Sequence, residues 1–221
     1  MSSEALRGVF KSFKKREFNM KYFLLIVILL LTSCSPKLSQ SFKKVSKPEK
    51  HWVFFHPFKA KKAFLLSKEA EKTKDSIANF GKIGKDNNGG QLDAFKHSFW
   101  MASLTQKIGK NAALSLGKAH EKGNYQTFKK RQLEDGLLPD KPSSEMDLFN
   151  NSVGVKVGSQ YNKASKKIII KQLLSSLKQG ELRILKKDNL GNFLNCQNKI
   201  IPIDSLKHQW MTKKCLVPSN Y

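Results

Sequence analysis

Apolar residues recur at intervals of three and four through the middle of the chain, between short runs rich in Gly, Asn and Pro. This spacing is typical of amphipathic helices, because 3.6 residues complete one turn. Helices of this kind bury their apolar stripes against one another, so the pattern predicts a helical bundle. The clearest stripe, in a predicted helix over residues 59–80, is formed by Ala63, Leu66, Ala70, Ile77 and Phe80.

The remaining helices are bounded by helix-breaking residues. Ser144 and Asp147 form a capping-box pattern that predicts a helix start. Further helices are predicted over residues 92–108, 112–121, 125–133, 144–157 and 165–177.

The pattern changes after Gly180. The stretches ELRIL (181–185) and NFLNC (192–196), separated by a turn, predict a β-hairpin, and KIIPI (199–203) predicts a third strand. The predicted fold is therefore mainly α, with a helical domain over residues 51–180 and a small β-rich appendage over residues 181–221.

The N-terminal part contains an export signal. Lys21 precedes an apolar run of ten residues, Tyr22 to Leu31, which is short of the roughly 20 residues of a membrane-spanning helix. The run ends in LTSC, which resembles the lipobox of bacterial lipoproteins, so we expect lipidation (palmitate and diacylglycerol) at Cys34. Residues 1–33 then form the signal peptide, although a start at Met20 would leave the first 19 residues untranslated.

Two segments connect the lipid to the bundle. Residues 34–50 are rich in Ser, Lys and Pro, and this composition predicts a lipidated tether. The aromatic stretch HWVFFHPF, residues 51–58, is expected to be an extended lead-in that packs on the core.

The chain is strongly basic, with 41 Lys and Arg against 17 Asp and Glu. Its lysines are scattered and arginine is scarce, which disfavours base reading, so no nucleic-acid partner is expected. We expect a protein anchored by lipid in the bacterial cell envelope, at the outer membrane if the cell is Gram-negative. Its partners would be the membrane and anionic envelope components.

Two cysteines remain after Cys34. Cys196 and Cys215 form an even pair in an oxidising compartment, which indicates a disulfide between them. The alternative is two free buried thiols.

Polar residues interrupt the apolar seams of three predicted helices. Burying such groups without partners costs roughly 1–3 kcal/mol each, so the economical arrangement is that they meet in one polar centre. Helical bundles build carboxylate and histidine metal sites in this way. The residues concerned are Asp93, His97, His120, Glu121, Asp147, Asn150 and Asn151.

Two functions are compatible with such a centre. In a hydrolase acting on envelope lipid, glycan or peptide, His97 or His120 would be the base, Glu121 or Asp147 would orient it, and Asn150 or Asn151 would stabilise an oxyanion. In a variant, a divalent metal ion is bound by Asp93, His97, His120 and Asp147. The other function is a non-catalytic binding or structural lipoprotein domain, in which the polar centre fixes the helix register. No complete catalytic motif is present, which favours the second function.

Three stretches that contain these polar residues together resemble an uncharacterised family of helical bacterial domains. They are DAFKHSFW (93–100), GKAHE (117–121) and EMDLFNNSVG (145–154). The family carries the elements Asp-Ala-Phe-Arg-His-x-x-Trp, Ala-His-Glu and Met-Asp-x-x-Asn-Asn-x-x-Gly in this order. Lys96 occupies a position where the family usually has arginine. The lysine keeps the positive charge but lacks the several N–H donors of the planar guanidinium group. The resemblance implies one shared polar centre and no particular activity.

Overall fold

The structure is a computed structural model that describes residues 45–81, 83–133 and 137–221. The predicted signal peptide, the predicted lipidation site Cys34 and most of the predicted tether lie outside these residues. Ser46–Tyr221 forms one compact unit. Across these described ranges, every helix is too short or too polar to cross a lipid bilayer.

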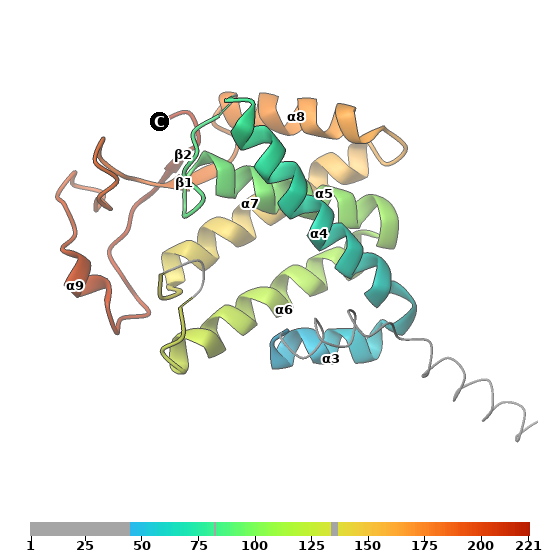
Figure 1. Ribbon diagram of the computed structural model, residues 1–221, viewed down its shortest axis with the longest axis horizontal. Coiled ribbons are helices and arrows are strands. Elements are labelled where there is room, and N and C mark those ends of the chain that lie inside the picture. Colours follow the sequence, from blue (N-terminus) through green and yellow to red (C-terminus); the bar gives the residue numbers. More distant parts are fainter. Residues whose placement is uncertain (1–44, 82, 134–136) are drawn as a thin grey trace, which may run out of the picture. The chain divides into compact units, whose positions relative to one another are not determined.

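The fold is mainly α, with a small antiparallel sheet near the C-terminus (Figure 1). The longer helices are α3 (Lys47–Phe55), α4 (Pro57–Asn79), α5 (Gln91–Ile108), α6 (Lys110–Lys129), α7 (Lys141–Gln160) and α8 (Lys166–Lys178). The C-terminal elements are β1 (Arg183–Leu185), the single-turn helix α9 (Ile203–Leu206) and β2 (Leu216–Pro218).

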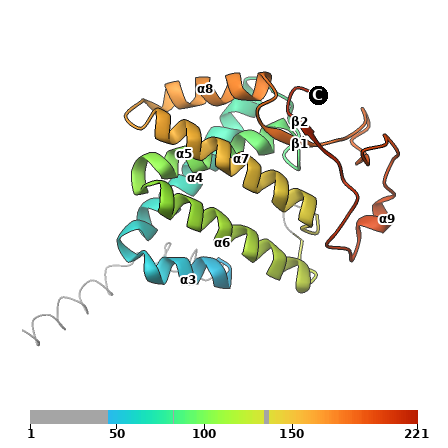
Figure 2. The same ribbon diagram turned by 180° about the vertical axis from the view of Figure 1, so that it is seen from behind.

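Helix α5 lies at the centre of the bundle and packs against α4, α6, α7 and α8 (Figures 1 and 2). One apolar cluster lies between α4, α5 and α8, and a second lies between α3, α4, α5 and α6. Phe95, Phe99 and Leu104 of α5 are almost fully buried. This central position explains why a polar pair on α5 is enclosed on several sides.

Helix α3 differs from the sequence prediction, which places a tether up to residue 50 and an extended segment over residues 51–58. Ser46 caps the helix and forms a capping box with Glu49, and Pro48 lies in the first turn. Trp52 is buried, and its indole N–H lies 2.8 Å from the Ser115 hydroxyl on α6. Capping and this tertiary anchor together stabilise a short helix that its apolar pattern alone does not indicate.

Two other helix boundaries differ from the prediction. The segments 112–121 and 125–133 are joined in α6, because Gly123 and Asn124 lie inside the helix and are buried there. Helix α7 begins at Lys141 and not near Ser144, because Asp140 is its N-cap and accepts from the Ser143 N–H at 3.0 Å. Asp147 is therefore not a capping residue and is available to the interior.

The β element is present, but its pairing differs from the predicted hairpin. Strand β1 pairs with β2, and Ile184 is opposite Val217. NFLNC and KIIPI contribute only the isolated bridges Lys187–Phe193 and Leu194–Ile200. The sheet thus joins residues more than thirty positions apart, a long-range pairing that local pattern does not reveal.

The C-terminal segment also holds the loop that precedes α5. The Leu185 N–H donates to the Gly89 carbonyl at 2.7 Å, and Lys187 donates to Asp86 and to the Asn88 carbonyl, each at 2.6 Å. Gly89 has a φ of +81°, and a Cβ there would lie 2.6 Å from Leu185 Cδ1. Glycine at this position lets the loop pack directly under β1.

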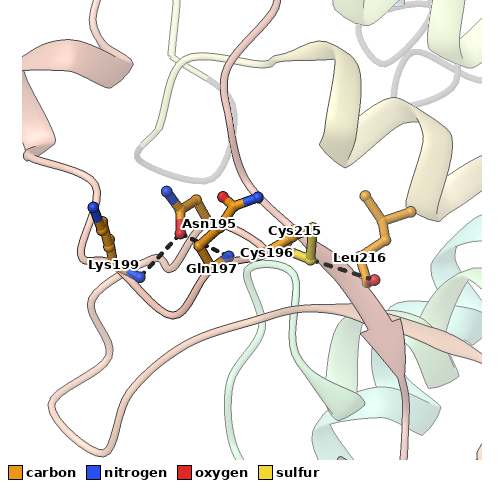
Figure 3. The surroundings of a disulfide bond; sticks show 6 residues. All are labelled: Asn195, Cys196, Gln197, Lys199, Cys215 and Leu216. Carbon is orange, nitrogen blue, oxygen red and sulfur yellow. Dashed lines mark hydrogen bonds between the residues drawn. A yellow bond between two sulfur atoms is a disulfide. The ribbon is translucent and has the colours of Figure 1, made fainter.

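Cys196 and Cys215 form a disulfide with a Cα–Cα distance of 4.9 Å (Figure 3). It fastens the turn between Leu194 and Ile200 to the residue just before β2. Nearby, the Asn195 side chain accepts from the Lys199 N–H at 2.9 Å and shapes the intervening turn.

We expect replacement of both Cys196 and Cys215 by Ser to lower the free energy of unfolding by about 3 kcal/mol, because the bond closes a loop of roughly 20 residues. Urea denaturation of the oxidised protein and the double variant measures this. Labelling of unreduced, denatured protein exported by its host should find no free thiol among these two residues, and two reactive thiols per chain would contradict the pairing.

Candidate metal centre

Two helices bring three buried side chains together. Asp93 and His97 lie one turn apart on α5, and Asp147 faces them from α7. His97 Nε2 lies 3.5 Å from Asp93 Oδ1 and 3.4 Å from Asp147 Oδ1. One ligand atom from each side chain lies within 4.8 Å of the other two, and each residue is less than a tenth exposed.

Helices α5 and α7 can bring these residues together because their backbones approach closely. A Cβ on Gly154 would lie 2.2 Å from the Ser98 carbonyl oxygen, and one on Gly158 would lie 2.5 Å from the Ala102 carbonyl oxygen. Small residues at a helix crossing allow this approach, and the resulting distance sets how near Asp147 comes to His97.

Asp93 is fixed by several contacts. Its Oδ2 accepts from the Gly89 N–H at 2.9 Å, and its Oδ1 lies 3.0 Å from the Lys96 ammonium. Burial lowers the pKa of Lys96, but the charge and hydrogen bond of Asp93 outweigh burial and raise that pKa above its usual range. Lys96 therefore remains a cation beside the two carboxylates.

His97 is held in its neutral form. Burial is the largest cause that lowers its pKa well below the usual value, and the charges of Lys96 and His120 lower it further. The Asn151 amide lies beside the ring and favours its protonated form, but it does not reverse the direction. A neutral imidazole can present a lone pair, which is the form that binds metal ions.

The two distances from His97 Nε2 suit a small divalent cation, and all three ligand atoms lie within 4.8 Å of one another. Metal–ligand bonds of about 2.0–2.2 Å in a tetrahedral site place neighbouring ligand atoms about 3.3–3.6 Å apart. Both contacts of His97 Nε2 fall in this range and are longer than good hydrogen bonds.

A cavity of about 70 Å³ opens beside the cluster, which is room for a few water molecules. Its walls come from the loop before α5, from α5, α6 and α7, and from the C-terminal segment. The polar residues that line it include Asn88, Asp93, Lys96, His97, His120, Asn124, Ser144, Asp147 and Lys214.

His120 lines this cavity but belongs to a second pair. Its Nδ1 lies 3.1 Å from Glu49 Oε1, and its ring lies 6.3 Å from the His97 ring, centroid to centroid. Burial raises the pKa of Glu49, but hydrogen bonding and charge from His120, together with bonds from Ser46, lower it to about 2. The Glu49 carboxylate is ionised and orients the His120 imidazole toward α3, the helix that carries Glu49.

The structure thus places the predicted residues at different points. Asp93, His97 and Asp147 meet, with Asn151 beside His97, whereas His120 lies on the cavity wall next to Glu49. Asn150 is used elsewhere: its amide accepts from the Arg183 N–H and donates to the Arg183 carbonyl, each at 2.9 Å, and so attaches β1 to α7. Glu121 is buried on α6 and accepts from Asn124 at 3.2 Å.

Glu49 and Lys96 have roles that the sequence reasoning did not assign. The stretch SKPE, residues 46–49, has the Ser-x-x-Glu spacing of a capping box with proline in the first turn. That signal would have identified α3 and its Glu49. No local signal would have paired Glu49 with His120, which is 71 residues away.

Fold and site define a mainly α-helical domain with a buried carboxylate–histidine centre between two closely packed helices. The chain belongs to the family described as Domain of unknown function (DUF6973), whose model matches residues 50–181. This range includes the three residues of the centre and His120. No curated protein and no solved structure matches the chain.

Proposed function

We propose that this protein is a lipid-anchored envelope protein whose helical domain binds a divalent metal ion through Asp93, His97 and Asp147. The single observation that carries the metal site is the convergence of three buried ligand atoms, within 4.8 Å of one another, beside a polar cavity. Imidazole together with carboxylate suits Zn²⁺ and related transition-metal ions better than Ca²⁺ or Mg²⁺.

The metal site is tested by loading the purified protein with Zn²⁺, Mn²⁺ or Co²⁺, removing excess ion and measuring bound metal. We expect about one equivalent per chain of at least one of these ions. Because a ligand that binds only the folded state stabilises it, ion at 100 times Kd should raise the free energy of unfolding by about 2.7 kcal/mol. Protein that retains no ion and melts at an unchanged temperature would refute metal binding.

Anchoring rests on LTSC at residues 31–34. We expect Cys34→Ala to abolish incorporation of labelled fatty acid and recovery of the protein with membranes, because no other residue would receive the acyl chains. A Cys196→Ala variant is the matched control and should be acylated normally. Membrane recovery and label retained by the Cys34→Ala protein would exclude this lipoprotein assignment.

A second function, metal-dependent hydrolysis of an envelope lipid, glycan or peptide, is favoured by His120, which lines the cavity and is held by Glu49. A carboxylate that fixes one imidazole nitrogen is the arrangement used to orient a general base. Metal-loaded protein should then hydrolyse a substrate of one of these classes, and His120→Gln should bind metal normally while losing activity. Equal activity of the two proteins would remove His120 from the reaction.

A further inference from the structure

The turn between α3 and α4 exposes aromatic side chains that the proposed metal site does not use. Phe54, Phe55 and Phe58 are 78%, 62% and 93% exposed. Leu65, which is 57% exposed, continues the apolar surface along α4, since residues 58 and 65 lie two turns apart on one face. We call Phe54, Phe55, Phe58 and Leu65 the aromatic corner.

The turn that carries the aromatic corner is held by contacts on its inner side. The Trp52 and His56 rings stack with their centroids 4.4 Å apart, and His56 Nδ1 lies 3.0 Å from the Trp52 carbonyl oxygen. Trp52 itself is anchored on α6 through Ser115. The aromatic residues that follow it in the sequence are therefore displayed outward by a fixed turn.

Within residues 50–68, the stretch that carries the aromatic corner, every charged side chain is a lysine, and Glu69, one turn after Leu65, pairs with Lys166. No acidic residue occurs from Lys50 to Lys68. In that stretch Lys59, Lys61, Lys62 and Lys68 are exposed. Exposed aromatic rings surrounded by lysines are typical of surfaces that insert into the headgroup region of anionic bilayers.

We infer that the aromatic corner docks on an anionic bilayer surface, with its phenylalanines among the headgroups and its lysines at the lipid phosphates. The length of the chain before Ser46 supports this occupant, and this step rests on the proposed lipidation of Cys34. Eleven residues separate Cys34 from Ser46, so Ser46 lies within about 40 Å of the acyl anchor. Exposure and charge support the docking independently of the anchor.

The test uses the mature chain, residues 34–221, with Cys34→Ala, so that binding reports on the aromatic corner alone. Ser46–Tyr221 is a compact unit with its own hydrophobic clusters, which this form retains. The probes are vesicles of phosphatidylglycerol and phosphatidylcholine in equal parts, and vesicles of phosphatidylcholine alone. We expect co-sedimentation with the anionic vesicles, at least tenfold weaker binding to the neutral ones, and weaker binding at high salt.

A double variant, Phe54→Ser with Phe58→Ser, should reduce the partition coefficient at least tenfold. The matched control is Leu190→Ser with Met211→Ser, because these side chains are 88% and 70% exposed. Both lie in the C-terminal segment, on the opposite side of the compact unit from the α3–α4 turn (Figure 1). Unchanged melting temperatures would show that both variants fold.

Three results would each overturn the inference: no binding to anionic vesicles, equal binding to both kinds of vesicle, or equal loss of binding in the two double variants. None of these results affects the tests of acylation or of metal content. If the protein is acylated and binds metal, but its acyl-free form does not bind vesicles, only the docking inference is wrong.

Discussion

Asp147→Asn is expected to lower the affinity for the divalent metal ion by about 100-fold or more, while the metal-free protein becomes no less stable. Removing a direct ligand should cost at least as much as removing an outer partner, for which losses of 10-fold to 100-fold are usual. In the metal-free form, two buried carboxylates lie close to His97 Nε2, and their ligand atoms lie within 4.8 Å of one another. Replacing one of them by a neutral amide relieves repulsion and desolvation.

Asp140→Asn is the matched control, because Asp140 is also a buried acid on α7's N-terminal side. It lies 2.8 Å from the Lys214 ammonium, and both side chains are 3% exposed. Breaking a buried pair from one side costs about 3–5 kcal/mol, so this variant should melt roughly 10 °C lower. Its affinity for metal should fall far less than that of Asp147→Asn, because Asp140 is not one of the three proposed ligands.

Calorimetric titration with the chosen ion and thermal melts in chelator measure both properties in both variants. If Asp147→Asn destabilises the metal-free protein by several kcal/mol, Asp147 is a satisfied member of a structural network. In that case the proposal of a metal site is wrong, and the polar centre serves to fix the register of α5 and α7.

Glu49→Gln is expected to lower the free energy of unfolding by about 2–3 kcal/mol at pH 6. The pKa of Glu49 falls from 4.5 to about 2 in the folded protein because His120 and Ser46 favour the carboxylate, and that fall is equivalent to about 3 kcal/mol. A depressed carboxyl pKa stabilises the fold above the unfolded value of 4.5. This stabilisation disappears as the pH falls through the folded value near 2.

Denaturant unfolding of wild type and Glu49→Gln between pH 6 and pH 3 should therefore show a difference in the free energy of unfolding that becomes smaller as the pH falls. Glu145→Gln is the control, since Glu145 is about half exposed and pairs with Lys141 on the same helix. Its effect should be within about 0.5 kcal/mol at every pH. A Glu49→Gln difference that does not change with pH would show that the shape of the helix cap matters and the charge does not.

The bundle itself was predictable because the local spacing of apolar residues indicates where helices form and which of their faces are buried. Of the predicted stripe, Ala63, Leu66, Ala70 and Ile77 are buried in α4, whereas Phe80 follows the end of α4 and is 73% exposed. The mainly α fold with a small β element is confirmed. The predicted boundary at Ser144 was wrong because Asp140, four residues earlier, caps α7 by accepting a hydrogen bond from the Ser143 N–H. Several residues can cap a helix start, and only the folded chain selects one.

The candidate site was likewise predictable only in part. Sequence alone determined that Asp93 and His97 share a face of one helix and that Asp147 and Asn151 share a face of another. Tertiary structure decided that His97 meets Asp147, that His120 turns to Glu49, and that Asn150 attaches β1. Each of those outcomes depends on backbone approaches, such as that of Gly154 to Ser98, which join residues far apart in the chain. Local spacing fixes the direction of a side chain from its helix, but only packing fixes what it meets.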